Sequence, residues 1–589
     1  MRLFLCIILT ASLSASTVVL APIIVKAKKE LPVSTWQFVE SLSTAHVTMP
    51  GFEEQQLKNI PGVATTTNGN SGQLTMIKIQ GAGSEYTKVL WSGLSISEMR
   101  ADASLIPFST GKVEVIKGIH CAEYGNGAIG GVVNVIPFSM PDDQNGGLKV
   151  SRGNYAQAGH LWWRQKTKDG FSLQQHIEDD AFHGKNSIPK RYQAKYPTAK
   201  SPETEKRYFL NQLGFDSHHV KTELQIGLIK SASTGSDTSL VSPYDSRSKR
   251  TLQIYVFELE GKHDNVQPFL KVLNTITNAQ DFSPYQNTMN ANRSESGKAK
   301  IGVRIKYDLV TFEPIAEYHH NTLDRPEFKQ QKNDEYAFAQ GIHLNGGTFK
   351  WKNWARVQKA DHYSPVYAFS SSLLKTHNDT EFSIHLGTGF RMPDLYLLND
   401  KKYGNKNLKN ESAYGGNIGI AQKTKVGIFN VLVFKTEYKN QITYQNSRYV
   451  NLGRARQEGF EVGWKNKVGS WGAELSGMYA DSVSLKPKIN LMNVPKTSVH
   501  GRIFYEQDDV ATSVGWRYIG HQTQPDFEQY NVRIKRGGYP VFFGDFQYKF
   551  KEQATWFVCV ENALARKIES PIGYRNPGFQ INTGINITW

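Results

Sequence analysis

The sequence predicts an all-β membrane barrel of about 22 antiparallel strands, with a smaller N-terminal α/β plug domain inside its lumen. Three observations lead to this fold class. The first residues have the form of an export signal, and the second half of the chain repeats an alternation of apolar and polar residues. Residues 30–140 lack long alternating strands and are rich in glycine.

The N-terminus, MRLFLCIILTASLSAS, predicts a secretory signal peptide over residues 1–16. Arg2 supplies the positive charge, residues 3–9 form a short apolar core, and small residues follow. Cleavage is expected between Ser14 and Ala21, and a short buried helix is the alternative. Export would place the mature chain outside the cytoplasm.

Composition narrows the function classes. The 589 residues are 39% hydrophobic, and beyond the N-terminus no run approaches the roughly 18 apolar residues of a membrane helix. The formal charge of +16 fits an anionic ligand or contact with anionic lipopolysaccharide, although a generally basic proteome explains it as well. No basic run with interleaved aromatics indicates nucleic acid. Cys121 and Cys559, as two buried thiols or one disulfide, show no metal-site spacing.

The barrel segment is predicted over residues 146–589 from its period-two alternation. In GFQINTGINITW (578–589), one face is apolar and ends in the aromatic Trp589, whereas the other face is polar but uncharged. The same period recurs at 460–464, at 471–479 and at 512–520. Asn466 and Gly469 are expected to lie in the short turn between the first two of these strands.

A soluble β-sandwich alternates too, but three features favour a membrane barrel. The strands are long, aromatics gather at strand ends, and the export signal leads out of the cytoplasm. At about 20 residues for each strand with its connection, the segment holds about 22 strands. The polar segments Asp179–Arg207 and Asp237–Arg250 are expected to be extracellular loops.

Residues 31–142 are predicted to form the plug. Their most telling stretch is VEVIKGIHCAEYGNGAIGGVVNVIPF (113–138), in which two apolar arms flank a glycine-rich bend. A barrel of about 22 strands has a lumen too wide for side chains to fill. We therefore expect this segment inside the lumen, where glycine lets one backbone pass close to another.

Five motifs, in order along the chain, resemble those of TonB-dependent outer-membrane receptors. LKNIPGV (57–63), IKIQGAG (77–83) and residues 113–136 resemble plug motifs. FRMPDLYLLND (390–400) with YGNKNLKNES (403–412) resembles paired barrel motifs, and VENALARKI (560–568) with GYRNPGF (573–579) resembles the last hairpin. The resemblance implies a receptor and active transporter in the outer membrane of a Gram-negative bacterium.

Within that family, the compact size and NGNSGQLTMIKIQG (68–81) are most similar to members that transport cobalamin. The resemblance implies that this plug loop lies under the ligand. Its ligand-facing residues would be Asn68, Ser71, Gln73, Leu74 and Thr75. A polar turn between strands, which needs no ligand, is the alternative.

Three residues depart from the family pattern, which has Arg where Gln80 and Lys117 stand and Asp where Ser92 stands. Those Arg residues normally pair with acids on the inner barrel wall. Gln80 therefore removes one buried ion pair, and plug seating is expected to rest more on hydrogen bonds. The second apical loop, residues 95–108, also matches the cobalamin transporters poorly.

No cofactor is expected to be required, and calcium is the one candidate. The acidic calcium-binding loops of cobalamin transporters are not evident in this sequence. The acidic triplet of residues 178–180 lies near the right place, and a solvated loop explains it equally well.

APIIVKAKKE (21–30) fits the TonB box of the family. Ile23, Ile24 and Val25 form an extended apolar strand directly after the signal, and Lys26 and Ala27 complete the box. Such a strand would add to the sheet edge of TonB, whose inner-membrane complex supplies the energy. The tail of the signal peptide is the alternative reading. The resemblance also implies a monomer.

The ligand is left open between cobalamin, which is the first choice, and a ferric siderophore, which the net positive charge favours mildly. Haem is disfavoured because residues 390–412 contain no histidine. A passive porin would have no reason to keep a plug and a TonB box. No Ser/His/Asp arrangement, metal-ligand cluster or phosphate loop indicates an enzyme.

Overall fold

The computed structural model describes residues 39–43, 57–67, 75–96, 104, 111–137, 144–184, 203–236, 245–283, 288–361, 363–445, 447–485, 488–525, 533–569 and 575–589. The predicted signal peptide, the TonB box and residues 68–74 of the predicted ligand site lie outside these ranges. All elements below belong to one compact unit, Val33–Trp589. No helix within the described ranges is long and apolar enough to span a membrane.

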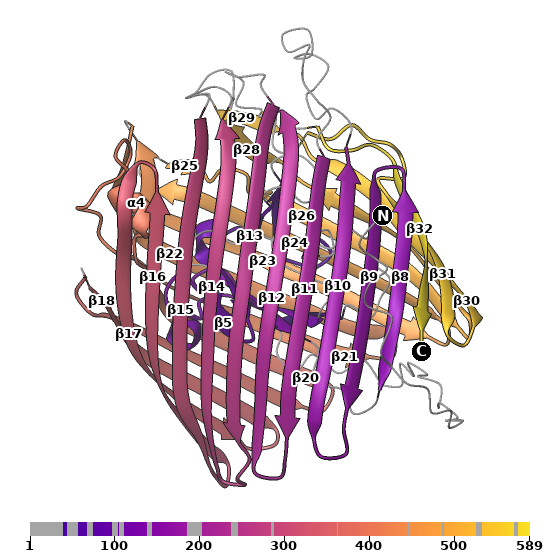
Figure 1. The fold of residues 1–589 in the computed structure, drawn as a ribbon, viewed down its shortest axis with the longest axis horizontal. Helices are drawn as coiled ribbons and strands as arrows, with labels where there is room; N and C mark the ends of the chain where they lie inside the picture. The colour runs from indigo at the N-terminus through magenta and orange to yellow at the C-terminus, as the bar shows by residue number, and fades with distance from the viewer. Residues whose placement is uncertain are drawn as a thin grey trace, which may run out of the picture. The chain divides into compact units, whose positions relative to one another are not determined.

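A closed antiparallel barrel of 22 strands forms most of the described chain (Figure 1). Its first half comprises β8 (Asn145–Gly153), β9 (Ala156–Lys166), β10 (Phe171–His183), β11 (Glu203–Asp216), β12 (Val220–Ser236), β13 (Asp245–Gly261), β14 (Val266–Ser283), β15 (Thr288–Tyr307), β16 (Val310–Arg325), β17 (Phe328–Asn345) and β18 (Phe349–Ala360). Its second half comprises β19 (Val366–His377), β20 (Thr380–Arg391), β21 (Glu411–Thr424), β22 (Gly427–Gln445), β23 (Arg448–Val468), β24 (Trp471–Leu485), β26 (Thr497–Gln507), β27 (Val510–Ile519), β30 (Tyr539–Lys551), β31 (Ala554–Glu561) and β32 (Gln580–Thr588). The prediction of about 22 antiparallel strands is confirmed.

Two small additions leave the ring intact. The three-residue strand β25 (Lys488–Asn490) pairs with the end of β24, and β28 (Gln522–Pro525) pairs with β29 (Arg533–Arg536) in the connection between β27 and β30. Because β32 pairs with β8, every strand of the ring has two neighbours. Closure of this kind leaves no unpaired edge.

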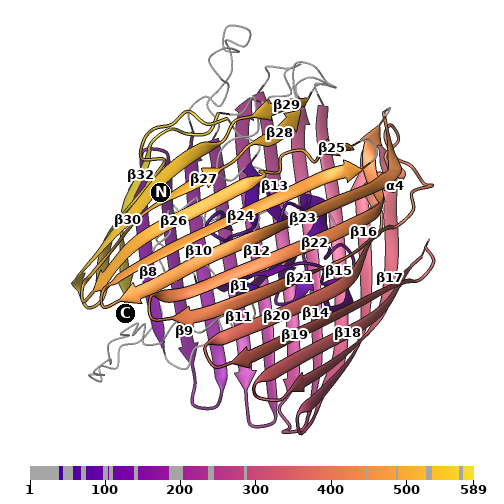
Figure 2. The ribbon, with the colours of Figure 1, turned by 180° about the vertical axis from the view of Figure 1, so that it is seen from behind.

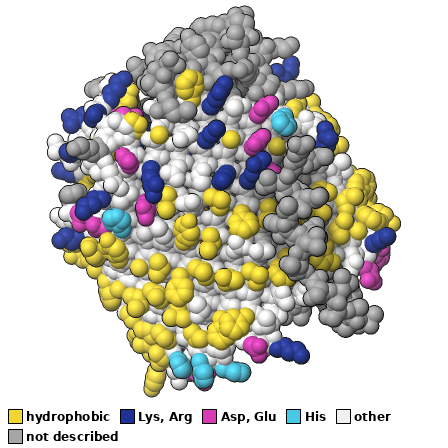
Figure 3. All heavy atoms as spheres, viewed as in Figure 1, with side chains coloured by type: hydrophobic (Ala, Val, Ile, Leu, Met, Phe, Trp, Pro, Cys, Tyr) yellow, Lys and Arg dark blue, Asp and Glu magenta, His cyan; other side chains and the backbone are white. Residues whose placement is uncertain are grey.

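The outer surface carries an apolar belt that faces lipid. Buried residues alternate with exposed apolar ones along the strands: on β12, the polar Gln225 is buried, whereas its neighbours Leu224 and Ile226 are 37% and 40% exposed. Figure 3 shows apolar side chains gathered in a band across this face, with Lys and Arg side chains scattered above it. This inside-out alternation is typical of a barrel in the outer membrane.

The connections differ in length between the two ends of the barrel. Two-residue turns such as Gly469–Ser470 join strands at one end, while residues 392–410 join β20 to β21 at the other. Bacterial barrels place short turns in the periplasm and long loops outside the cell. Asn466, predicted to lie in a turn, belongs to β23; the turn occurs at Gly469, whose φ of 59° favours glycine.

Both predicted polar loops are shorter than expected. β10 runs through Asp179 to His183, β11 begins at Glu203, and β13 begins at Asp245, so both ends of the first loop and the end of the second are strand. Asp179 pairs in register with Arg207 on the outer face. The strands extend beyond the lipid into water, where both faces of a strand can be polar. Such strand ends lack the apolar–polar alternation, so the sequence predicts them as loops.

The plug lies within the ring of strands, where its indigo segments are visible from both sides (Figures 1 and 2). Its main sheet has the order β1-β6-β7-β4-β5, formed by β1 (Val39–Ser43), β4 (Thr87–Trp91), β5 (Leu94–Ser95), β6 (Gly111–Lys117) and β7 (Gly131–Pro137). A separate hairpin joins β2 (Val63–Thr67) to β3 (Thr75–Ile79), and η1 (Ser84–Tyr86) and α2 (Cys121–Tyr124) are short helices. The predicted N-terminal plug is confirmed.

The apolar arms around the glycine-rich bend form β6 and β7, and the bend between them contains α2. Val115 and Val133 are fully buried between the sheet and the barrel wall. Gly131 lies where a Cβ atom would stand 2.5 Å from the carbonyl oxygen of Ile116. The residue must therefore be glycine for β6 and β7 to meet.

Deleting Trp589 should lower the amount of assembled protein severalfold. The backbone N–H and C=O of Gly146 both pair with Trp589, at 3.0 Å each, where the ring closes. Two unpaired backbone groups cost about 1–3 kcal/mol each. The measurement is the amount of heat-modifiable protein in isolated outer membranes. Trp589→Phe keeps both backbone bonds and should assemble normally; unchanged assembly of the deletion would contradict this role.

Candidate functional site

A first buried carboxylate on the barrel wall, Glu461, holds two side chains of the plug. Glu461, on β23, accepts from Lys117 Nζ at 2.6 Å and from Gln80 Nε2 at 3.1 Å. The Lys117 and Glu461 side chains are 1% and 3% exposed. Gln457 Nε2, four residues earlier on β23, donates to the backbone oxygen of Gln80 at 2.5 Å. Lys117 and Gln80 are two of the three departures from the family pattern. Lys117 keeps an ion pair, whereas Gln80 contributes hydrogen bonds.

The third departure, Ser92, lies in the turn between β4 and β5. Its φ of 51° is left-handed, and its backbone N–H donates to Val135 O at 2.8 Å. Lys271 Nζ on β14 lies 3.3 Å from Ser92 O, so the barrel contacts this turn through its backbone. Trp91 Nε1 donates to Gln225 Oε1 at 2.6 Å beside it.

A second buried carboxylate ties the plug to the FRMPDLYLLND motif. Tyr86 donates its hydroxyl to Glu411 Oε1 at 3.1 Å, and Arg391 Nη1 contacts Glu411 Oε2 at 2.8 Å. Burial, followed by the charge of Glu411, raises the pKa of Tyr86 well above its ordinary value. The hydroxyl therefore stays protonated and acts as a donor at neutral pH.

Helix α2 contacts the neighbouring part of the wall, strands β17 to β20, through its carbonyl groups. Arg356 on β18 donates to Ala122 O at 3.2 Å and Glu123 O at 3.3 Å, and it pairs with Glu317 at 2.9 Å. His385 on β20 lies 2.7 Å from Ile119 O. These contacts hold a helix too short to be stable alone.

His120, which precedes α2, and Cys121, its first residue, have pKa values shifted by burial so that both stay uncharged at neutral pH. Burial lowers the pKa of His120 to about 4, so its ring is uncharged where it stacks on His385, with centroids 4.4 Å apart. Burial raises the pKa of Cys121 to about 11. Cys121 and Cys559 are both free and buried, which decides between the two alternatives left open by the sequence.

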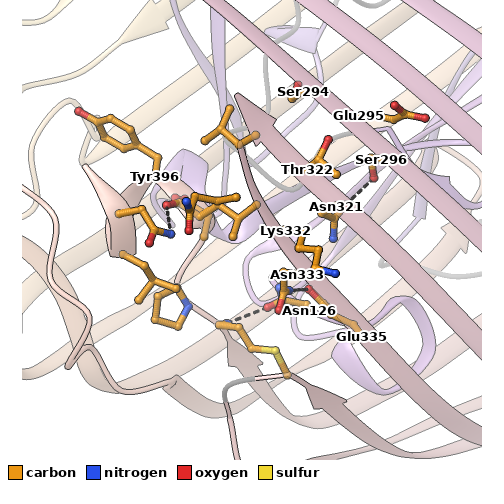
Figure 4. A pocket seen from close by; sticks show the side chains of 18 of the residues that line it. Asn126, Ser294, Glu295, Ser296, Asn321, Thr322, Lys332, Asn333, Glu335 and Tyr396 are labelled. Carbon is orange, nitrogen blue, oxygen red and sulfur yellow. Dashed lines mark hydrogen bonds between the residues drawn. The ribbon is translucent and has the colours of Figure 1, made fainter. Parts of the chain in front are cut away.

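A cavity of about 410 Å³ lies between plug and wall at the end of the barrel that carries the longer connections (Figure 4). The plug contributes Ile96 and Asn126, and strands β14 to β17 contribute a row of hydroxyl and amide side chains. The third side is formed by residues 392–399, which include α4 (Leu395–Asn399). The volume falls within the range of small-molecule sites.

The third side of the cavity is fixed by a short helix and by the plug. Asp394 caps α4 by accepting from Leu397 N at 2.9 Å. Asn126 Oδ1 accepts from Met392 N at 2.8 Å, which joins the plug to the segment before α4. The segments around Asn126 and Met392 therefore both line the cavity and join the plug to the barrel.

The predicted ligand residues are only partly placed. Asn68, Ser71, Gln73 and Leu74 lie outside the described residues. Thr75 begins β3, has no exposed surface, and donates its hydroxyl to Thr67 Oγ1 at 3.1 Å. It does not line the cavity. The assignment of this loop to a ligand stays a prediction.

The acidic triplet near residue 178 does not form a loop. It lies within β10, where Glu178 and Asp180 are buried and Asp179 points to the outer face. Alternation along a strand separates the three carboxylates onto two faces. No group of three or more His, Cys, Asp or Glu side chains in the described ranges is placed to hold a metal ion. Calcium stays an untested prediction.

The cavity-lining residues of β14 to β17 were missed by sequence reasoning. They include Ser296, Asn321 and Asn333, which are separated along the chain and carry no local motif. The one sequence signal for this site was the motif at 390–400, which supplies its third side. Register between neighbouring strands, not spacing along the chain, brings the rest together.

Two family models match the chain. The model for TonB dependent receptor-like β-barrels matches residues 140–563, and the model for the TonB-dependent receptor plug domain matches residues 54–132. Together they match most of the described plug and the barrel up to residue 563, in the order that the fold shows.

Several solved structures are similar in fold. A variant of the ferric enterobactin receptor PfeA of Pseudomonas aeruginosa is 16% identical, with a TM-score of 0.82 over 95% of this chain and 99% of that chain. The siderophore receptor PirA of Acinetobacter baumannii is 14% identical, with a TM-score of 0.80 over 95% and 99%. The copper transporter OprC is 14% identical, with a TM-score of 0.80 over 94% and 98%. At these identities the likeness concerns the fold.

Replacing Glu461 with Ala should lower the free energy of unfolding by about 3–5 kcal/mol, because Lys117 is left charged and buried. Denaturation of the detergent-solubilised protein, followed by tryptophan fluorescence, measures this change. The double variant Glu461→Leu with Lys117→Met should recover much of the loss.

The matched control is the exposed pair Lys467–Glu506, 2.6 Å apart with both side chains 33% exposed. Lys467→Ala should change the free energy of unfolding by less than about 1 kcal/mol. An equal effect of both single variants would show that Glu461 has no special role in plug seating.

Proposed function

Since this chain belongs to the family of TonB-dependent receptors, we propose that it imports a ferric siderophore across the outer membrane. The family consists of receptors and transporters, not enzymes. The finer assignment rests on the cavity between plug and wall at the end with the longer connections. A seated plug below such a cavity fits a ligand that is captured outside and released only when energy is supplied.

The fold comparisons support the siderophore alternative better than cobalamin. The similar structures include receptors whose names state ferric enterobactin or siderophores as ligands. The cobalamin prediction rested on the compact size of the chain and on residues 68–81. Of its five predicted ligand-facing residues only Thr75 is described, and that residue is buried in the plug hairpin. Cobalamin is therefore kept as the second candidate.

Ligand identity is tested by measuring the affinity of the purified protein for a panel of probes. The panel contains a ferric catecholate, a ferric hydroxamate, and cobalamin with and without calcium. Saturable binding of a ferric complex supports the proposal. Saturable binding of cobalamin alone would overturn it and restore the first choice from the sequence.

We also infer that the inner-membrane TonB complex drives transport through residues 23–27. Ile24→Pro removes a backbone donor from a strand that pairs by its backbone. Ligand binding to cells should persist, whereas accumulation of radiolabelled ligand should fall at least tenfold. Ile24→Ala keeps the backbone N–H and is the matched control, with near-normal uptake expected. Normal uptake by the Ile24→Pro variant would show that residues 23–27 are not the TonB box.

A further inference from the structure

The barrel side of the cavity is lined mainly by neutral polar side chains and carries no excess of positive charge. On β14 to β17, the residues at its lumen-facing positions are Thr275, Thr277, Ser294, Ser296, Asn321, Leu323, Gln331, Asn333 and Glu335. Glu295 and Lys332 occupy alternate positions along β15 and β17, yet both also line the cavity, where they carry opposite charges (Figure 4). Among these described lumen-facing residues, Glu335 is the one charged side chain, and it is an acid.

Charged groups around the cavity are already paired. Asp394 contacts Arg391 at 3.7 Å and caps α4, while Arg391 also contacts Glu411. Arg325 stacks on the Tyr396 ring at 4.7 Å and pairs with Glu327 at 3.6 Å.

The remaining cations lie at the rim or beneath the cavity. Lys406 is exposed at the rim. Lys298 is buried further along β15, and Lys300 beyond it pairs with Glu317 at 3.8 Å. Neither β15 lysine lines the cavity. The lining therefore provides no excess of positive charge for an anion.

One buried amide points to the chemistry of the ligand. Asn321 is 7% exposed, and its Oδ1 accepts from Ser296 Oγ at 2.7 Å (Figure 4). Its Nδ2 has no hydrogen-bond partner among the described residues. Buried amide donors in folded proteins are nearly always paired. A carbonyl or hydroxamate oxygen in the cavity would supply the missing acceptor.

We propose that the cavity takes an uncharged, amide-rich ferric complex of the hydroxamate class, with Asn321 donating to it. A ferric tris-hydroxamate is neutral, because each hydroxamate brings one negative charge against ferric iron. A ferric tris-catecholate is an anion, because each catecholate brings two. The lining offers a desolvated anion no excess of positive charge, whereas a neutral complex meets hydroxyls and amides. This inference rests on the proposed function and narrows it.

The rival is the anionic class, which the similar enterobactin receptors name. The lysines and arginine between residues 185 and 200 would favour it, and that segment lies outside the described residues. Attraction by such charges weakens with salt, whereas hydrogen bonding to a neutral ligand changes little. The dependence of the affinity on salt therefore distinguishes the two ligand classes, in addition to the affinity itself.

Affinity is measured for ferrichrome, a neutral ferric tris-hydroxamate, and for ferric enterobactin, at low and high salt. We expect ferrichrome to bind at least tenfold more tightly, with an affinity that salt leaves unchanged. Tighter binding of ferric enterobactin would overturn this inference but uphold a siderophore receptor. Binding of neither ferric complex would instead overturn the proposed function.

Asn321→Ala should weaken ferrichrome binding about tenfold, since a buried hydrogen bond to the ligand is lost. Asn321→Asp should also weaken it, because the donor is replaced by a charge. Asn353→Ala, on β18 outside the cavity, is the control and should bind normally. Heat-modifiability of each variant confirms assembly. Unchanged ferrichrome affinity in assembled Asn321→Ala protein would overturn the role of Asn321.

Discussion

Every other feature of this protein depends on the closure of the barrel between β32 and β8. Lipid offers no hydrogen bonds, so each backbone group of a membrane strand must be paired within the protein. The last residue of the chain completes that pairing by bonding to Gly146 in both directions. Closure of 22 strands leaves a lumen that side chains of the wall cannot fill, and the plug occupies it. The contacts between plug and wall and the cavity between them follow from this arrangement.

The plug is held by a few buried charges set among many neutral hydrogen bonds. Glu461 and Glu411 each receive a cation from one side and a neutral donor from another. Removing one partner from such a site leaves a buried charge unpaired, which strongly lowers the free energy of unfolding. At Glu461, the neutral donor is the side-chain amide of Gln80.

The cavity and the seat are built from the same backbone segments. Asn126 lines the cavity and also joins the plug to the segment before α4. Arg391, at the end of β20, pairs with Glu411 below and with Asp394, which caps the helix on the cavity wall. A ligand that moves this wall would therefore act directly on groups that hold the plug.

The sequence by itself determined the class of fold and the family. Alternation along Gln580–Thr588, glycines around α2 and five ordered motifs are local patterns, and each predicts its element without knowledge of its neighbours. Tertiary structure decided the cavity. Ser296, Asn321 and Asn333 become neighbours only because strand register aligns β15 with β16 and β16 with β17. Register is set by pairing between strands and cannot be derived from the sequence of one strand. The side chains that line the cavity wall are therefore brought together only when the barrel forms.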